Sequence, residues 1–285
     1  SKKMIDALNK SNPHYHLYCK FLSGKDKSKK YEFIKNFKRG GISHSNQVGF
    51  HKEGLCGFDI KSQYPTALMH MKIPAGVSRW VNHFEPEAHG FYHISNLVWT
   101  DEAKKFKPIA SKKDNGVLDW ASDNIKQVHV DSYMIHYLMK NCGLVSFDVI
   151  EGLVSDIDIE SQKLFGTYVG TLYKEKAQQD ALKDAGKEFN KPDREAIKLL
   201  LNSLTGKLVE DPSRYFKLEF KSEIGNGQSI NGMGIDKIAT DEEKMNDWVV
   251  AGVMVYSYSK RILWDYVNCL PNKSDDVIHI ETDGI

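Results

Sequence analysis

Cysteine, unbalanced charge and long apolar runs are scarce in this sequence. The formal net charge of the 285 residues is only +1, so the overall charge neither requires nor excludes a nucleic-acid partner. No apolar run approaches the roughly 20 residues that cross a bilayer, and no apolar stretch of a secretory signal follows the first residues. We therefore expect an intracellular protein with no signal peptide, no transmembrane segment and no membrane partner.

The cysteines and histidines do not form a recognisable framework. The absence of any CxxC pair indicates free thiols in a reducing compartment, at Cys19, Cys56, Cys142 and Cys269. The tightest histidine group has no nearby cysteine and no helical spacing, so we interpret it as surface residues rather than a zinc site: His83, His89 and His93. The sequence also contains no internal repeat. Its 41% hydrophobic and 27% charged residues are typical of a globular protein of one large or two modest domains.

Two apolar segments, far apart in the chain, each end in an aspartate. Residues 55–60 predict a buried strand that places Asp59 at its end, and residues 277–280 predict a short strand that leads into Asp283. Between them, residues 77–157 mix strand-like pieces with polar turns, which indicates an inserted α+β subdomain.

Helical patterns dominate the second half. Apolar residues recur at four-residue steps from Leu164 to Leu172, and a polar break at 184–190 precedes a second helix over 194–208. Two helices joined in this way form an αα-hairpin. Residues 248–270 are apolar and predict a further helix.

Each aspartate alone has an ordinary structural interpretation. Asp59 could cap the following turn, and Asp283, which precedes a glycine, could belong to a hairpin turn. Together they suggest more, because two-metal sites need carboxylates from neighbouring strands, and a backbone carbonyl such as that of Ile60 is a further hard ligand.

The helix at 194–208 offers a cationic face. Its polar positions fall along one side, at Arg194, Lys198, Asn202 and Thr205. Its apolar positions take the other side, at Ile197, Leu200, Leu201, Leu204 and Leu208. A solvated amphipathic helix is one interpretation, and cations that neutralise a triphosphate are the other. Lys176 on the preceding helix could point the same way, and Gly206 would let the helix end close to a base pair.

In combination these segments resemble family B DNA polymerases, most closely the protein-primed (terminal-protein) branch of viruses and linear plasmids. Residues 59–65, DIKSQYP, resemble motif A, DxxSLYP. Residues 198–206 resemble motif B, KxxxNSxYG, and residues 279–284 resemble motif C, YxDTDS. Residues 38–41 resemble the YxGG loop without its tyrosine. The motifs occur in the family's order, and the long gaps between them leave room for the two insertions of the protein-primed branch.

The sequence departs from these motifs at several positions. Gln63 replaces the usual leucine of motif A, and Thr205 replaces a tyrosine that forms a wall of the nascent base-pair pocket. Motif C has three substitutions, among them Glu281 and Gly284.

The resemblance implies an α+β fold: a right-hand polymerase palm, an antiparallel sheet with helices, with helical-hairpin fingers and inserted α+β subdomains. The expected division is palm with motif A at 1–76, a first insertion of the terminal-protein-contact type at 77–157, fingers with motif B at 158–209, a second insertion at 210–245, and palm ending at motif C at 246–285. On this view the chain is an internal piece of a larger polymerase, without the exonuclease or the thumb.

The resemblance also implies a role for each matching position. Asp59 and Asp283 would be catalytic and would bind metal together with the Ile60 carbonyl. Nucleotide contacts would come from Tyr64, which would exclude a 2′-hydroxyl, and from Lys176, Lys198, Asn202 and Thr205. Primer–template contacts would come from Arg39, Gly40, Gly41, Ser62, Gly206 and Lys207.

The function implied is template-directed DNA polymerisation by two-metal phosphoryl transfer to a primer 3′-hydroxyl, or to a protein hydroxyl at initiation. The expected cofactor is a pair of Mg²⁺ ions, with Mn²⁺ as a substitute. The expected partners are primer–template DNA, deoxynucleoside triphosphates and a terminal priming protein. One alternative is a catalytically inactive, nucleic-acid-binding remnant of such an enzyme. Another is a reverse transcriptase or RNA polymerase, which would lack the Lys-x-x-x-Asn-Ser helix.

Overall fold

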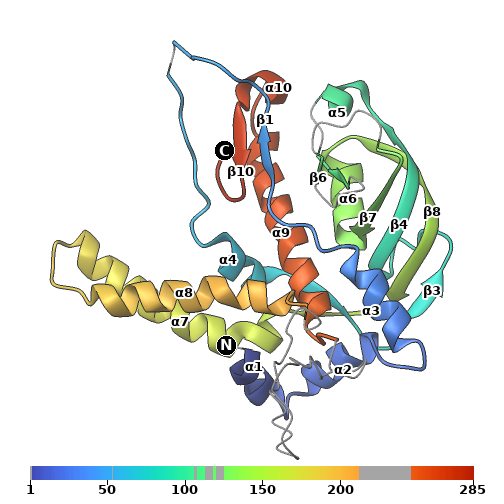
Figure 1. The fold of residues 1–285 in the computed structure, drawn as a ribbon, viewed down its shortest axis with the longest axis horizontal. Coiled ribbons are helices and arrows are strands. Elements are labelled where there is room, and N and C mark those ends of the chain that lie inside the picture. The colour runs from blue at the N-terminus through green and yellow to red at the C-terminus, as the bar shows by residue number, and fades with distance from the viewer. Residues whose placement is uncertain (1, 53, 106–107, 113–117, 120–124, 212–244) are drawn as a thin grey trace, which may run out of the picture.

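The fold is organised around one long helix, α9 (Val249–Asn268), whose first turns are buried (Figure 1). The computed structural model describes residues 2–52, 54–105, 108–112, 118–119, 125–211 and 245–285. The first turns of α9 are apolar on every side, which is the pattern of a helix enclosed by neighbours rather than of a surface helix. Four helices contact it: α3 (Lys27–Lys35), α4 (Gln63–His70), α6 (Ser132–Asn141) and α8 (Lys191–Leu208). The helix predicted over 248–270 is therefore confirmed.

The N-terminal helices close one end of the main core. They are α1 (Lys2–Asn9), α2 (Pro13–Phe21) and α3 (Lys27–Lys35). Asn12 caps α2 by accepting a hydrogen bond from the His14 N–H, and Pro13 occupies the first turn, where a missing N–H costs nothing. Trp248, at the start of α9, stacks on the tyrosines of α2 and donates its indole N–H to Asp6. The start of α9 is thereby fixed to this end of the molecule.

A four-stranded antiparallel sheet forms a second body beside α9. Its strands occur in the order β3 (Arg79–Val81), β8 (Leu144–Ser155), β4 (His89–Trp99) and β7 (Gln127–Asp131). Helix α6 (Ser132–Asn141) follows β7 directly and is capped by Asp131, whose carboxylate accepts the Met134 N–H. The sheet and α6 share a separate hydrophobic cluster. Shorter elements complete this region: α5 (Asp101–Lys105), β5 (Ser111–Lys112) and β6 (Leu118–Asp119).

The predicted αα-hairpin is confirmed. Helix α7 (Gln162–Asp184) and helix α8 (Lys191–Leu208) run antiparallel and extend to one side of the molecule (Figure 1). Asn190 starts α8 as an N-cap, with Pro192 in the first turn. The hairpin is joined to the sheet region through β2 (Lys72–Ala75), which pairs with β9 (Ile157–Glu160).

Four short elements lie around the predicted aspartates. Strand β1 (Ser43–Ser45) pairs antiparallel with β10 (His279–Glu281), which follows α10 (Lys273–Asp276). Helix α4 (Gln63–His70) lies at the base of the hairpin and contacts both α7 and α9. Helices and antiparallel strands thus occur together, as the α+β class requires.

The buried strand predicted over residues 55–60 is wrong. Leu55 is 63% exposed and Phe58 is 68% exposed, and the segment forms only a single β-bridge, from Asp59 to Gly284. A short apolar run becomes a buried strand only when another layer covers it, and in the described part of the chain nothing covers these side chains.

Most of the predicted second insertion, residues 212–244, lies outside the described residues. The four cysteines are free, as expected. Among the helices of the described ranges, none has the length and apolar character needed to cross a membrane.

Candidate active site

The two predicted aspartates lie on neighbouring segments. The N–H of Phe58 donates to the Ile285 carbonyl at 2.9 Å, and the Ile60 N–H donates to the Asp283 carbonyl at 2.8 Å. Asp59 is bridged to Gly284 in antiparallel fashion. Two positions from opposite ends of the chain are therefore brought together, as the sequence predicted.

The electrostatics of this pair suit a cation. Burial raises the pKa of the half-buried Asp283 carboxyl, and the negative charge of Asp59 raises that pKa further. A carboxyl pKa that is raised by a neighbouring negative charge indicates that a cation bound there would be favourable. Carboxylate and carbonyl oxygens are the ligands that Mg²⁺ and Mn²⁺ prefer, so Asp59, Asp283 and the Ile60 carbonyl fit such an ion in chemical type. In the described ranges no three acidic, histidine or cysteine side chains form a metal-binding group.

Asp283 lies in a tight turn. The Gly284 N–H donates to the Glu281 carbonyl at 2.8 Å, and Glu281 returns a hydrogen bond to the Gly284 carbonyl at 3.0 Å. Thr282, at the centre, has a left-handed backbone with φ of 55°. The hairpin-turn interpretation of this sequence is therefore correct as geometry, and the turn places Asp283 on the segment that is bridged to Asp59. The Glu281 carboxylate is engaged elsewhere, where it accepts the Ser43 hydroxyl at 3.2 Å.

The glycine loop packs against this turn. A Cβ built on Gly41 would lie 2.8 Å from the Thr282 hydroxyl oxygen, so only glycine fits there. The Thr282 N–H donates to the Ile42 carbonyl at 2.6 Å. Gly40, by contrast, has open space around it. The Arg39 side chain is only 8% exposed and donates to the Ala110 carbonyl, so its guanidinium faces inward.

The first turn of α4 carries the rest of motif A. Ser62 is held in the left-handed region, with φ of 58° and ψ of 44°, directly before the helix. Gln63, in place of a leucine, is buried and donates to the Ser259 carbonyl of α9 at 3.1 Å. The Tyr64 ring meets the edge of Tyr256 at 5.8 Å. Burial, then Tyr256, then Asp283 raise the pKa of Tyr64 to about 12, which places its hydroxyl in the field of Asp283.

On α7, Lys176 is buried and already has a partner. Its ammonium lies 3.2 Å from an oxygen of Asp180, and Asp180 also accepts Arg194 Nε of α8 at 2.6 Å. Lys176 and Asp180 line a cavity of about 230 Å³ with Lys61 of motif A. Sequence reasoning missed Lys61 and Asp180, although the four-residue spacing of Lys176 and Asp180 is a signal for a helical ion pair.

The polar face predicted on α8 is only partly correct. Lys198, Asn202, Gly206 and Lys207 are exposed, and Lys207 forms an ion pair with Glu210. Thr205 is 2% exposed, and its hydroxyl has no hydrogen-bond partner among the described residues. Leu200, assigned to the apolar side, is exposed. The cause is tertiary packing: α4 and α9 contact α8 and cover Thr205, whereas Leu200 lies on a side of the helix that no other element covers in the described part of the chain.

Comparison with known proteins identifies relatives by family and by fold. The family described as DNA polymerase type B, organellar and viral, matches the chain over residues 14–253. Among curated protein sequences no significant match exists.

Solved structures of Phi29 DNA polymerase resemble the chain in fold. The complex with primer–template DNA and incoming nucleotide substrates has a TM-score of 0.64 and 14% identity, and the alignment covers 99% of this chain and 46% of that one. The post-translocation complex with primer–template DNA has a TM-score of 0.62 and 15% identity, with the same coverage of both chains. The chain thus spans less than half the length of the structures that it matches.

Proposed function

The chain belongs to the organellar and viral type B DNA polymerases, and on that premise we propose that it forms the core of a template-directed DNA polymerase. The observation that carries the proposal is the meeting of Asp59 and Asp283, each in its family motif, on bridged segments. The reaction joins a deoxynucleoside monophosphate to a primer 3′-hydroxyl: the hydroxyl oxygen forms a bond to the α-phosphorus, its proton is lost, and pyrophosphate leaves.

Asp59, Asp283 and the Ile60 carbonyl would hold the divalent ions. When bound there, Mg²⁺, or Mn²⁺ in its place, supplies the charge that favours the ionised 3′-hydroxyl and the departing pyrophosphate. The protein groups provide the geometry. The bridge between Asp59 and Gly284 keeps the backbones of the two motifs together before any ligand arrives, so less rearrangement is needed on binding.

Residues of α4 and the hairpin would bind the nucleotide. Tyr64, beside the aspartates, would stack under the sugar and exclude a 2′-hydroxyl, which predicts a preference for deoxyribonucleotides. Lys176 and Lys198 would offset the triphosphate charge, with Asn202 beside them. Because Asp180 already pairs with Lys176, a triphosphate would have to compete with that carboxylate. Thr205 is buried and would form part of the wall of the base-pair pocket.

The primer–template would lie along the surface that joins the glycine loop, motif A and the end of α8. Gly40, Gly41 and Ser62 would contact its backbone, with Gly206 and Lys207 on the other side. Gly206 has open space where a side chain would be, which allows close approach of a base pair. Arg39 would contribute through the backbone of its loop, since its side chain is buried.

The protein-primed mode is a narrower proposal. It rests on the resemblance of the motifs and on the α+β region at 77–157, which would contact a terminal protein whose hydroxyl replaces the primer at initiation. A reverse transcriptase or RNA polymerase is a weaker alternative now that the family is established.

Primer extension tests the proposal. The wild-type chain should extend a primed template with deoxynucleotides in Mg²⁺, whereas Asp59→Asn and Asp283→Asn should lose at least about 100-fold in rate, because each removes a metal ligand. Asp156→Asn, which changes an exposed acid outside the site, is the matched control. Binding of primer–template without extension by the wild type would identify an inactive remnant. A Tyr64→Val variant that gained no ribonucleotide use would contradict the role of Tyr64.

A further inference from the structure

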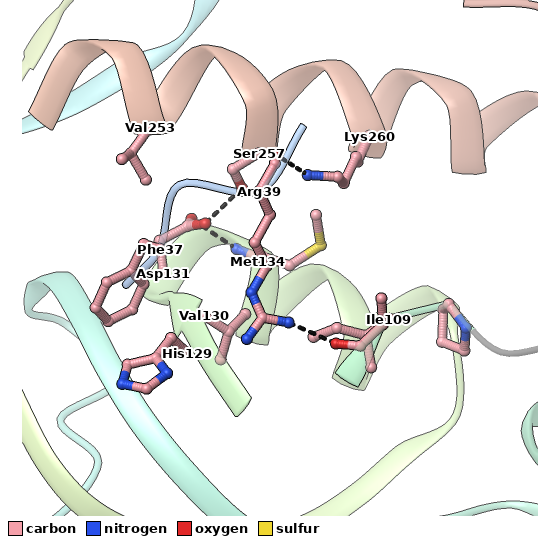
Figure 2. Close-up of a pocket in the computed structure, with 12 residues that line it drawn as sticks. Phe37, Arg39, Ile109, His129, Val130, Asp131, Met134, Val253, Ser257 and Lys260 are labelled. Carbon is pink, nitrogen blue, oxygen red and sulfur yellow. Dashed lines mark hydrogen bonds between the residues drawn. The ribbon is translucent and has the colours of Figure 1, made fainter. Parts of the chain in front are cut away.

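A lysine of α9 holds the backbone of the glycine loop. Lys260 donates from Nζ to the Arg39 carbonyl at 2.8 Å (Figure 2). This hydrogen bond connects the central helix directly to the residue before Gly40 and Gly41. Lys260 belongs to none of the sequence motifs of the proposed active site.

The Arg39 side chain anchors the same loop in the opposite direction. In Figure 2 it crosses the pocket from the loop toward the sheet region and donates to the Ala110 carbonyl. Its Nε atom is buried without a hydrogen-bond partner in the described part of the chain. Burial lowers the pKa of Arg39 to about 10. Holding such a group inside the protein is costly, so its inward position requires firm packing on both sides.

The loop in turn fixes the turn that carries Asp283. Gly41 packs directly against Thr282, and the Ile42 carbonyl accepts the Thr282 N–H at 2.6 Å. Two residues further on, β1 begins and pairs with β10 in the register Ser43 to Glu281. The loop that begins at Arg39 therefore leads directly into the contacts that hold the Asp283 turn.

Charged groups of both signs surround the Lys260 ammonium. Arg39 repels the Lys260 ammonium, Asp131 attracts it, and His129 lines the same pocket, which is about 40 Å³ in volume. The Asp131 carboxylate is shared with the Ser257 hydroxyl and the Met134 N–H, so it compensates Lys260 only in part. Burial first, then Arg39, lower the pKa of Lys260 to about 7.

From these contacts we propose that Lys260 and Arg39 are positioning residues that hold the Asp283 carboxylate in place beside Asp59, through the loop at residues 39–42. This inference rests on the proposed function, in which Asp283 and Asp59 form a metal site before the ion binds. It adds a device outside these sequence motifs: the half-buried Lys260 of α9 and the buried Arg39 of the loop, which together set the position of the motif C turn.

The test measures two properties of Asp283 in Lys260→Met. One is the pKa of Asp283 in the metal-free protein, followed by carboxyl NMR, and the other is Mn²⁺ affinity, followed by titration. If the loop relaxes and the two carboxylates separate, the pKa of Asp283 falls toward its usual value and Mn²⁺ binds roughly 10- to 100-fold more weakly. Lys260→Arg keeps a cationic donor and should restore most of the affinity. Lys10→Met, an exposed lysine at the opposite end of the molecule, should change neither property.

The outcomes separate the two proposals. Unchanged pKa and Mn²⁺ affinity in Lys260→Met would overturn the positioning role. Wild-type protein that binds Mn²⁺ no better than Asp283→Asn would overturn the metal site, while the pKa of Asp283 would still report on positioning. If Lys260→Met does not fold, Gly41→Ala replaces it, because its methyl group would push the loop from Thr282 and should lower the same pKa and affinity.

Discussion

Backbone strain is concentrated at the two aspartate motifs. Among the described residues, the non-glycine positions with positive φ are Ser62, Asn96 and Thr282. Two of these three belong to motifs A and C, within three residues of Asp59 or Asp283. Residues held in the left-handed region cost roughly 1–3 kcal/mol each and persist where surrounding contacts impose them. Part of the stability of the fold is therefore used to shape the candidate site.

Relieving that strain should stabilise the protein. In Ser62→Gly, the left-handed backbone is retained without the steric cost of a Cβ, so the free energy of unfolding should rise by about 1 kcal/mol. The control is Ser203→Gly, within α8, where the backbone is helical and glycine should lower stability by about 1 kcal/mol. Urea unfolding of both variants measures the difference. Equal destabilisation by both substitutions would show that Ser62 is not strained.

The two aspartates should be electrostatically coupled. Because the charge of Asp59 contributes to the raised pKa of Asp283, Asp59→Asn should lower the pKa of Asp283 toward that of an ordinary aspartate. Carboxyl chemical shifts in a pH titration measure this directly, and Asp156→Asn should leave the titration of Asp283 unchanged. If the pKa of Asp283 does not move in Asp59→Asn, the carboxylates are too far apart to share an ion.

At the scale of elements, one partly buried acid links the two helices of the hairpin. Asp180 of α7 pairs with both Lys176 in its own helix and Arg194 of α8. Burial alone would raise the pKa of Asp180, but the hydrogen bonds from Arg194 and Lys176 outweigh it and lower that pKa. The ionised form is therefore favoured by folding.

This direction gives a pH-dependent prediction for Asp180→Asn. The wild-type ion pairs stabilise the fold fully above the unfolded pKa of Asp180, near 3.8, and lose that contribution as the pH falls through the lowered folded pKa. At pH 7 the variant should melt about 2–4 °C lower than the wild type. This difference in melting temperature should disappear in acid. A difference that persisted at pH 2 would mean that Asp180 acts through packing rather than charge.

Helix α9 approaches the end of α8 closely enough to require a glycine. A Cβ on Gly252 would lie 2.4 Å from a Val209 methyl group and 2.8 Å from the Leu208 backbone. Gly252→Ala should therefore lower the free energy of unfolding by about 1–3 kcal/mol. Gly170→Ala in α7, where nothing lies within 4 Å of the added carbon, should instead be neutral or stabilising. Thermal unfolding of the two variants compares them, and similar stability of both would refute the close contact.

At the scale of the whole molecule, periodicity predicted the long helices and the order of motifs predicted the meeting of Asp59 and Asp283. These features can be read from short segments of the sequence. The wrong predictions concern burial, which depends on which distant parts of the chain pack over a segment. Leu55 and Phe58 look like core residues but remain exposed, whereas Thr205 and Arg39 look like surface residues but are buried. Burial of Arg39 depends on contacts with Ala110 and Lys260, which are distant in sequence.

The loop before the candidate site contacts both the central helix and the sheet region. Lys260 of α9 donates to the Arg39 carbonyl, and the Arg39 guanidinium donates to the Ala110 carbonyl. The same loop lies beside the surface proposed for primer–template DNA.

In the proposed function, Asp59 and Asp283 together hold divalent metal for nucleotide transfer. The most direct measurement is the anomalous scattering of manganese in a crystal of this chain soaked with Mn²⁺ and a deoxynucleoside triphosphate. We predict a manganese peak bonded to carboxylate oxygens of both residues at roughly 2.1–2.2 Å, absent from Asp283→Asn. Manganese bound elsewhere, or no peak in an ordered site, would contradict the claim.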